Sequence, residues 1–224
     1  MSTSPPRALR TAPTDGAASE ESDASSTIAE GRLILDWSDQ ADVLAWAIAN
    51  ERTKLADRWF AQHGYPRPTI EWGFRVEDVG DPQLQAVFDH WRASIDRHPT
   101  PTYRRIALSF HEINGSLASL LEAIEDGRDF RYVRFAPTVA QTEGRDWTGR
   151  RLSEFAVQSY RGVFYLALYR VMIQRRTPCL LRHQTDDHRP GSAFRRLLAP
   201  LGDDEGRVIG FLNANSYDLP APGS

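Results

Sequence analysis

The stretch between residues 183 and 188 carries the side chains that divalent metals prefer. It contains His183, Asp186, Asp187 and His188, and imidazole and carboxylate groups are ordinary metal ligands. The same stretch ends a strand-like segment and precedes a Pro-Gly pair, where polar residues gather because the chain turns. We therefore expect a solvated loop here and no metal site.

The single cysteine, Cys179, is the next candidate for chemistry. It cannot form an intramolecular disulfide or a multi-cysteine zinc site, which is typical of a protein from a reducing compartment. It follows a proline at the start of an apolar, strand-like segment, and a lone cysteine in such a place is usually a small, inert hydrophobic residue. We expect a buried thiol and a cytoplasmic protein.

The motifs that present a nucleophile or hold a phosphate are missing from the sequence. No G-x-S-x-G motif occurs, and Ser109, in Ser109-Phe110-His111, lacks the sharp turn that exposes a catalytic hydroxyl. The segment from Gly144 to Gly149 lacks the lysine of a phosphate-binding loop. Because the usual acid, base and nucleophile constellations are not found, we expect that the chain is not an enzyme.

The charge of the chain argues against two classes of partner. It has 27 Lys and Arg against 30 Asp and Glu, so it lacks the positive field that draws in nucleic acids or anionic membranes. Its arginine pairs are scattered, which is typical of solvated charge. No apolar run approaches the roughly 20 residues that cross a bilayer, and residues 1–30 do not resemble a secretory signal. We expect no nucleic-acid partner and no membrane.

The first third of the chain predicts a tail followed by helices. Residues 1–30 are rich in small polar and acidic residues and too poor in apolar ones to offset their ordering entropy, which predicts a disordered tail. From Trp37 to Gln62 apolar residues recur at steps of three and four, which predicts a helix. The Pro- and Gly-rich loop that follows has room for a short strand around Glu71 to Val76. Residues 31–81 thus form a helical extension.

The middle of the chain continues with helical patterns. Asp81-Pro82 is a cap followed by proline at the first helical position, and it begins an amphipathic helix. Its apolar residues are Leu84, Val87, Phe88, Trp91 and Ile95. The segment from Ile106 to Ile124 also reads as helical, with an interruption at Asn114-Gly115.

After Gly127 the pattern changes to strands around a long helix. Phe130 to Phe135 reads as a strand, because aromatic and β-branched residues suit a pleated surface. Short helical pieces from Thr138 to Phe155 come next, and then a helix that is apolar on several sides. Three strands close the chain, at 177–185, 192–201 and 208–217, before a tail at 218–224. Because consecutive strands with short links pair antiparallel, we predict an α+β fold, with helices on one face of an antiparallel sheet.

This order of elements, with four short segments, resembles the PAS domain, and more closely the single-domain PAS-like group found in proteobacteria. The likeness covers roughly residues 82–216. The matching segments are Trp91-Arg92, Asp129-Phe130-Arg131-Tyr132, the run GRDWTGRRLSE at 144–154, and Leu197-Leu198-Ala199-Pro200-Leu201.

The resemblance implies a PAS-like domain over residues 82–217, with a five-stranded antiparallel sheet wrapped over the long helix. The strand at 130–135 would form one wall, Gly144 and Gly149 would permit tight turns, and Trp147 would lie against the interior. The chain is then expected to be a PAS-type sensory or regulatory protein. Since no output module follows residue 217, its signal would pass to a separate signalling protein.

The resemblance also sets expectations for cofactors and ligands. Some PAS sensors bind haem through a helix histidine, but His90 and His111 are not on the long helix, and light-sensing relatives carry their cysteine in a motif that Cys179 lacks. We expect no cofactor. If a small apolar ligand binds, its site would contain Phe135, Trp147, Phe164, Leu168, Cys179 and Phe211.

Two other interpretations stay open. The same fold with a filled core could be a non-sensing dimerisation or adaptor module that forms homodimers through its N-terminal helices. For every residue of the ligand set, plain core packing is the competing interpretation. An enzyme would require a cleft with paired titratable groups, against which an apolar pocket argues.

Overall fold

The computed structural model describes residues 36–113, 115–184 and 193–217, and all of them fall in one compact unit, Leu35–Ser224. The expected tails at 1–30 and 218–224 lie outside these ranges, as do Asp186, Asp187 and His188 of the suggested metal cluster and the side chain of His183. Within the described ranges, no helix has the length and apolar character that crossing a bilayer requires.

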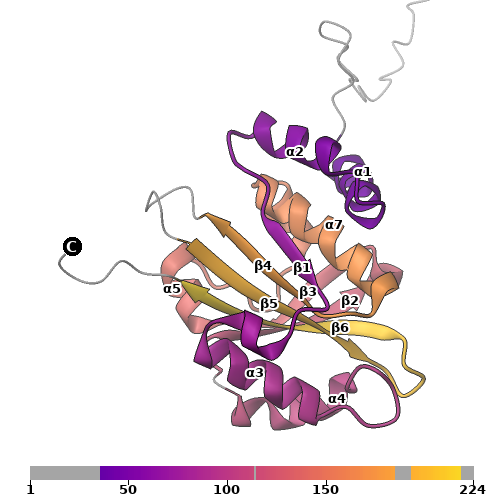
Figure 1. Cartoon of the computed structure of the whole chain (residues 1–224), viewed down its shortest axis with the longest axis vertical. Coiled ribbons are helices and arrows are strands. Elements are labelled where there is room, and N and C mark those ends of the chain that lie inside the picture. Colours follow the sequence, from indigo (N-terminus) through magenta and orange to yellow (C-terminus); the bar gives the residue numbers. More distant parts are fainter. Residues whose placement is uncertain (1–35, 114, 185–192, 218–224) are drawn as a thin grey trace, which may run out of the picture. The chain divides into compact units, whose positions relative to one another are not determined.

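Six strands form one sheet in which every neighbouring pair is antiparallel (Figure 1). Their order across the sheet is β1-β4-β5-β6-β2-β3. The α+β class with an antiparallel sheet is therefore confirmed, but the expected number of five strands is wrong. The strands are β1 Thr69–Trp72, β2 Ala118–Ile124, β3 Asp129–Arg134, β4 Cys179–Gln184, β5 Ala193–Gly202 and β6 Val208–Tyr217.

The sixth strand, β1, comes from the segment that precedes the helix at residues 82–93. It pairs with β4 from Thr69, opposite Arg182, to Trp72, opposite Cys179. The sequence pattern placed a short strand slightly later, at 71–76, where the chain instead enters a 3-10 turn, η1 (Val76–Val79). Pro66 and Pro68 precede the strand, and the prolines mask the short run that can pair.

Seven α-helices and two further 3-10 turns accompany the sheet in the described residues. The helices are α1 Trp37–Ala49, α2 Thr53–Gln62, α3 Pro82–Ala93, α4 Tyr103–Ser109, α5 Pro137–Glu143, α6 Leu152–Ala156 and α7 Tyr160–Arg175, and the turns are η2 Phe110–Glu112 and η3 Glu125–Gly127. Each of α5, α6 and α7 lies between β3 and β4 in the chain.

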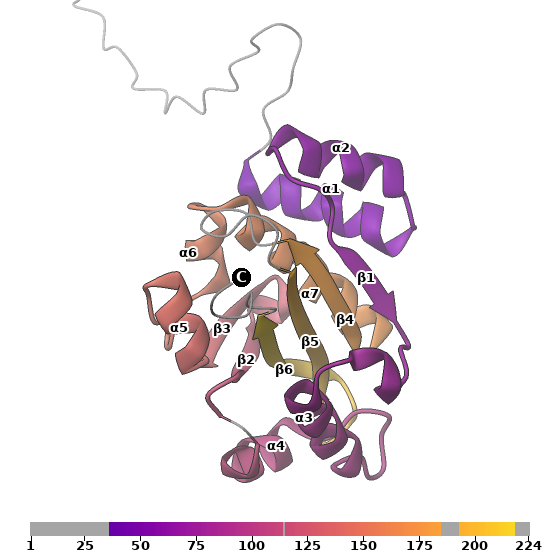
Figure 2. The same cartoon turned by 60° about the vertical axis from the view of Figure 1, so that its left-hand side comes forward.

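The single helix expected from Trp37 to Gln62 is two helices that lie side by side (Figure 2). The chain turns between them at Asn50 to Arg52. The Asn50 side chain donates to the Trp46 carbonyl at 2.8 Å, and Glu51 adopts a left-handed backbone with φ 55°. No Gly or Pro marks this break, and the apolar residues recur at helical spacing on both sides of it. The sequence therefore shows no sign of the turn.

The helical interpretation of Ile106 to Ile124 is wrong in its second half. The chain is helical through α4 and η2, but residues 118–124 form β2, which pairs with β6 on one side and β3 on the other. Leu120 faces one side of the sheet and Leu121 the other, and both are buried. A strand that is apolar on both faces has no period-two pattern, so its leucines resemble a helical stripe.

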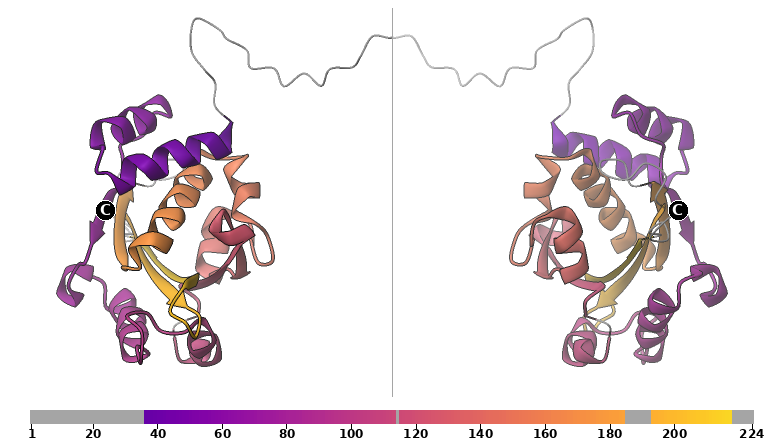
Figure 3. Two further views of the ribbon diagram at one scale, coloured as in Figure 1. Left: turned by 90° about the vertical axis from the view of Figure 1, so that its right-hand side faces the viewer. Right: turned by 90° about the vertical axis from the view of Figure 1, so that its left-hand side faces the viewer.

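Helices cover both faces of the sheet, which corrects the expectation of one covered face (Figure 3). Along β5, Leu198 packs on the side of α7, whereas Leu197 and Ala199 pack on the side of α3 and α4. The Trp91 Nε1–H of α3 donates to the Pro200 carbonyl at 2.9 Å. Successive side chains of a strand point to opposite faces, so the central strands of a sheet covered on both faces carry apolar residues at odd and even positions alike.

The long helix α7 is enclosed as its sequence predicts. Ten of its sixteen residues are buried, and it packs against α1 and α6 as well as the sheet. Its first turn is capped by Ser159, whose hydroxyl accepts from the Arg161 N–H at 3.2 Å, and Arg176 ends it with φ 54°.

The cap of α3 yields a first prediction. Asp81 Oδ1 accepts from the backbone N–H groups of Gln83 and Leu84 at 2.8 and 3.0 Å, and its Oδ2 accepts from the Ser216 hydroxyl. Burial acts to raise the pKa of Asp81, but these hydrogen bonds outweigh it and hold the pKa below its ordinary value. Asp81→Ala is therefore expected to lower the free energy of unfolding by about 1 kcal/mol.

The matched control is Asp81→Asn, which keeps the cap but not the charge. Because the folded-state pKa of Asp81 is depressed, the carboxylate stabilises the fold above its ordinary pKa, and this stabilisation is lost as the pH falls below about 4. Urea titrations at pH 7 and pH 3.5 measure both effects. If Asp81→Ala and the wild-type chain are equally stable at pH 7, Asp81 does not act as the cap of α3.

Gly162 allows a second prediction about how α6 meets α7. A Cβ at this position would lie 2.4 Å from the Ala156 backbone nitrogen. Glycine to alanine in an open helix stabilises by roughly 0.5–1 kcal/mol, but here the backbone of α6 must move. We expect Gly162→Ala to destabilise the chain by about 1–3 kcal/mol in chemical denaturation. A gain in stability means that α6 and α7 are not in this close contact.

Candidate functional site

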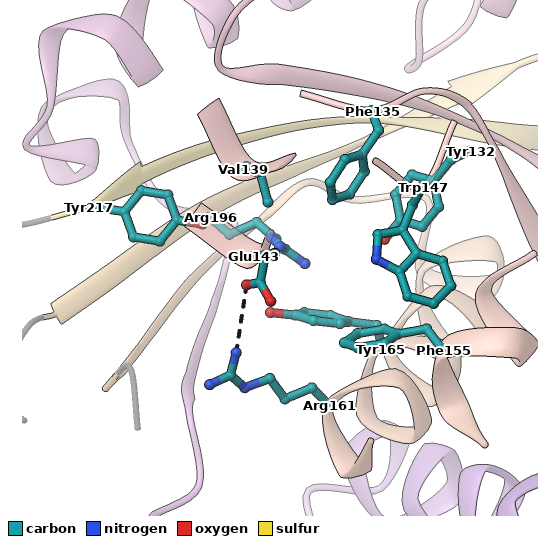
Figure 4. A pocket seen from close by; sticks show the side chains of 10 residues that line it. All are labelled: Tyr132, Phe135, Val139, Glu143, Trp147, Phe155, Arg161, Tyr165, Arg196 and Tyr217. Carbon is teal, nitrogen blue, oxygen red and sulfur yellow. Dashed lines mark ion pairs between the residues drawn. The ribbon is translucent and has the colours of Figure 1, made fainter. Parts of the chain in front are cut away.

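A pocket opens between the α7 face of the sheet and the helices α5 to α7 (Figure 4). Its walls combine aromatic rings with three charged groups. The lining residues are Tyr132, Phe135, Val139, Glu143, Trp147, Phe155, Arg161, Tyr165, Arg196 and Tyr217. The cavity itself has a volume of about 30 Å³, and the space between the lining residues is about 490 Å³ when the open mouth and the adjoining solvent are included.

The strand and helix periods explain how two arginines reach this space. Along β5, Arg195 and Leu197 face the α3 side, where the Arg195 Nη1 donates to the Gly80 carbonyl at 3.0 Å, so Arg196 faces the α7 side. Arg161 and Tyr165 are one turn apart on α7 and therefore project in the same direction. The pocket collects side chains from six elements, β3, α5, α6, α7, β5 and β6, and from the segments that connect them.

Arg196 forms the floor of the pocket. The residue is 7% exposed, its Cζ lies 4.2 Å from the centroid of the Tyr165 ring, and its Nε–H donates to Asn215 Oδ1 on the neighbouring strand. Burial acts to lower the pKa of Arg196, whereas the surrounding phenols act to raise it once they ionise, with a net increase. The guanidinium therefore keeps its charge at every physiological pH.

The tyrosines around this charge are neutral. Burial raises the pKa of Tyr132 and of Tyr217 to about 12, although Arg196 acts in the opposite direction, and it also raises the pKa of Tyr165. Their hydroxyls can both donate and accept hydrogen bonds, and their ring faces suit a flat ligand or a guanidinium.

At the mouth, Glu143 faces Arg161. Glu143 Oε1 lies 3.7 Å from Arg161 Nη1, as the dashed line in Figure 4 marks, and the two side chains are 36% and 15% exposed. Glu143 is the last residue of α5, and Gly144 follows it in the left-handed region with φ 69°. Among the lining residues, two guanidinium groups meet one carboxylate.

The Gly-Arg-Asp-Trp-Thr-Gly segment forms one wall of the pocket through Trp147. The Gly149 N–H donates to the Tyr132 carbonyl at 2.7 Å, which places the segment against β3, and φ 80° at Gly149 requires glycine. The Phe135 N–H donates to Thr148 Oγ1 at 3.1 Å. Between these contacts Trp147 turns inward, 6% exposed, with its ring 5.2 Å from that of Phe155. The predicted inward position of Trp147 is confirmed.

The earlier Gly-Arg-Asp, at 127–129, holds α6 in place. Asp129 is buried, and its Oδ1 and Oδ2 accept from the Ser153 backbone N–H at 3.1 Å and the Ser153 hydroxyl at 2.7 Å. Since Phe155 is on α6, this carboxylate positions part of the pocket from outside it. Both copies of the tripeptide therefore shape the same wall from opposite ends of β3.

Only two of the six residues expected to contact a ligand line this pocket, Phe135 and Trp147. The other four belong to the apolar core around α7, and each is at most 2% exposed. There the ring of Phe164 packs against Phe60 at 5.1 Å, and that of Phe211 against Tyr169 at 4.8 Å. The four core residues are Phe164, Leu168, Cys179 and Phe211.

The charged residues of the pocket were missed by reasoning from the sequence. Arginines in strand-like runs were interpreted as solvated surface, and Arg196 stands beside a second arginine that does face the other way. The signal was present in the spacing: Arg196 is two residues before Leu198, so it must share the face of that buried leucine. Glu143, Arg161 and Tyr217 carried no comparable signal.

The histidines considered as haem ligands are held in other ways. His90 Nε2 lies 2.8 Å from Ser109 Oγ, and its Nδ1 lies 3.9 Å from Glu112 Oε2, so the order superficially matches a nucleophile, a base and an acid. However, the Ser109 hydroxyl donates its only hydrogen to the Arg105 carbonyl at 3.1 Å. His90 must then donate to the serine, which is the reverse of an activated nucleophile.

His111, the other histidine considered as a haem ligand, lies at the surface. The His111 side chain is 78% exposed and its Nδ1 lies 3.1 Å from the Leu108 carbonyl. In the ranges 36–113, 115–184 and 193–217, no group of three His, Cys, Asp or Glu side chains is arranged to hold a metal ion.

Comparison of the chain with protein-family models, with curated proteins and with solved structures found no match. The geometry of the pocket therefore carries the functional conclusion.

Cys179 supplies a third prediction. Its side chain is fully buried, its Sγ lies 3.9 Å from Met172 Sδ, and burial raises the pKa of the thiol. We expect no reaction with 5,5′-dithiobis(2-nitrobenzoate) in the native chain at pH 8 and about one thiol per chain in guanidinium chloride. Reaction of the native chain within the mixing time would contradict the burial of this strand.

Proposed function

We propose that the protein is a PAS-type sensory or regulatory module that binds a small molecule in the pocket between α5, α6, α7 and the sheet. The observation that carries the proposal is the buried guanidinium of Arg196 at the floor of an aromatic pocket. Removing a guanidinium from water is costly, and a concave, largely aromatic site with a few converging polar groups is the usual form of a ligand-binding site.

The order of elements also supports the PAS assignment. The segment from β3 through α5, α6 and α7 to β4, β5 and β6 follows the order on which the resemblance rests. The run at 144–154 contributes a wall of the pocket through Trp147 and holds β3 through Gly149. In this proposal the domain extends from residue 82 to 217, and a separate protein receives its signal.

A second candidate, a dimerisation or adaptor module, is favoured by the outer surface of α1. Val43 and Trp46 are 40% and 53% exposed and are one turn apart, so they form an apolar stripe on this helix. An exposed tryptophan is typical of protein interfaces. In this alternative the association of two chains, and not a ligand, is the function.

Native mass spectrometry of the full chain, purified without denaturation, separates these candidates. The sensory proposal predicts an added mass of one small molecule per chain, which disappears when the chain is denatured. Val139→Phe, which fills the pocket from a residue that is 1% exposed, is expected to abolish it. Val133→Phe, at a position that is 38% exposed on β3, is the control and is expected to retain it.

The outcomes differ for the two candidates. An added mass that persists in Val139→Phe places the small molecule outside this pocket and contradicts the site. A dimer with no added mass favours the adaptor module instead. Circular dichroism of both variants establishes that they are folded.

A further inference from the structure

We propose that the chain has a second binding site, for an uncharged aromatic molecule of one or two rings, in a cavity between α1, α2 and β1. This inference goes beyond the proposed function, because the cavity and the pocket around Arg196 share no lining residue. The three elements follow one another in the chain, as Figure 2 shows.

The cavity has the volume of a small aromatic molecule. It measures about 220 Å³, whereas packed protein interiors have few voids larger than a water molecule. An apolar cavity of about 150 Å³ is known to bind benzene, so this space is sufficient for one substituted ring or for two fused rings. The lining residues are Ala47, Ile48, Glu51, Thr53, Ala56, Phe60, Arg67, Ile70, Trp72 and Phe164.

Apolar side chains form most of the wall. Ile70 and Trp72 are two residues apart on β1, so they point to the same face of the sheet, where they pack against the core around α7. On the helical side, Phe60 is 2% exposed, and its ring lies 5.1 Å from that of Phe164 at an angle of 72°. Such walls favour a ligand ring, which can make edge and face contacts with them.

Two alanines leave the space open. Ala47 is on α1 and Ala56 is on α2, and both are buried. Because their side chains are short, the junction of the two helices retains a volume that larger residues would fill. A substitution at either position can therefore close the cavity.

The charged groups at the entrance already have partners. Glu51 and Thr53 are exposed, so the cavity opens to solvent on their side. Arg67 Nε lies 2.6 Å from Asp57 Oδ1, and Glu51 Oε1 lies 3.9 Å from Arg175 Nη2. Since these pairs neutralise the entrance and burial of an unpaired charge is costly, the cavity favours a ligand without charge.

A molecule in this cavity joins α2 to the sheet. Ala56 and Phe60 belong to α2, Ile70 and Trp72 belong to β1, and all four contact the same space. A ligand that binds only the closed arrangement of these elements reduces how often α2 separates from β1. Binding is therefore expected to slow the hydrogen exchange of the amides of α2 severalfold.

Isothermal titration calorimetry of the full chain with benzene, pyrimidine, indole and benzoate tests the ligand class. Pyrimidine has the shape of benzene, but its ring nitrogens lose their hydration in an apolar site, so benzene is expected to bind at least about tenfold more tightly. Indole buries more apolar surface and should bind about five- to tenfold more tightly than benzene. Benzoate should bind no more tightly than benzene, because Arg67 is already paired.

Each of these comparisons can overturn part of the inference. Equal binding of benzene and pyrimidine overturns the apolar class, and tighter binding of benzoate than of benzene overturns the neutral class. Weaker binding of indole than of benzene overturns the size. If neither benzene nor indole binds, the inference fails as a whole, whereas native mass spectrometry of a retained molecule decides the proposed function separately.

Substitutions locate the site. Ala56→Phe is expected to weaken indole binding at least about tenfold, because the new ring takes the place of the ligand. Ala61→Phe makes the same change at an exposed position of α2 and should leave binding unchanged. Val139→Phe fills the pocket around Arg196 and should also leave it unchanged. Indole binding that persists in Ala56→Phe, or that is lost in either control, overturns the site.

Nuclear Overhauser effects locate the ring without any substitution, so the test does not depend on the folding of Ala56→Phe. The ring protons of indole should show contacts to the methyl groups of Ala47, Ala56 and Ile70. Contacts to other methyl groups alone overturn the site. Hydrogen exchange in α2 that saturating indole leaves unchanged overturns the connection between α2 and β1.

Discussion

The guanidinium of Arg196 lies 4.2 Å from the centroid of the Tyr165 ring, on the face of the sheet that packs against α7. A buried charge of this kind is tolerated only where neighbouring groups replace its hydration. Asn215 accepts its Nε–H, and the tyrosine rings combine an apolar body with a polar tip and an electron-rich face. A fully apolar wall could not meet this requirement, so polar atoms and aromatic faces of the lining residues surround the guanidinium.

The arrangement of the helices determines where such a site can exist. Helix α7 is buried by α1 on its outer side and by the sheet on its inner side, so its central turns are filled by side chains that exclude a ligand. Its first turns, next to the short helices α5 and α6, border the pocket, and Arg161 and Tyr165 are found there. Short helices with few internal hydrogen bonds are also the elements that can move at low cost.

Local signals in the sequence predicted much of the secondary structure. Asp81-Pro82 marked the start of α3, and the apolar run after Ser159 marked α7, because capping and periodicity act over a few residues. The strand β2 was missed because it is apolar on both faces, and one of its two neighbours, β6, is distant in the sequence, with Phe211 opposite Leu121. Pairings of this range leave no local pattern, and the same is true of the packing of α3 on the second face.

Two of the pocket residues were predicted because their positions depend on local features of the sequence. Trp147 follows from a local turn that glycine permits, and Phe135 from its place at the end of a strand, so both were found. Arg196 required knowledge of which face of β5 meets α7, which depends on the whole sheet. Phe164 and Phe211 were attractive as ligand contacts because they are aromatic, but their depth makes them part of the packing.

The pairing of β1 with β4 affects whether the sheet can associate with another chain through its edge. Were the residues before Asp81 removed, β4 would become the outer strand and present a row of unused amide and carbonyl groups. Such a row is a template on which another polypeptide can add a strand. By pairing with β4, the segment before α3 covers a sheet edge that could otherwise pair with another chain.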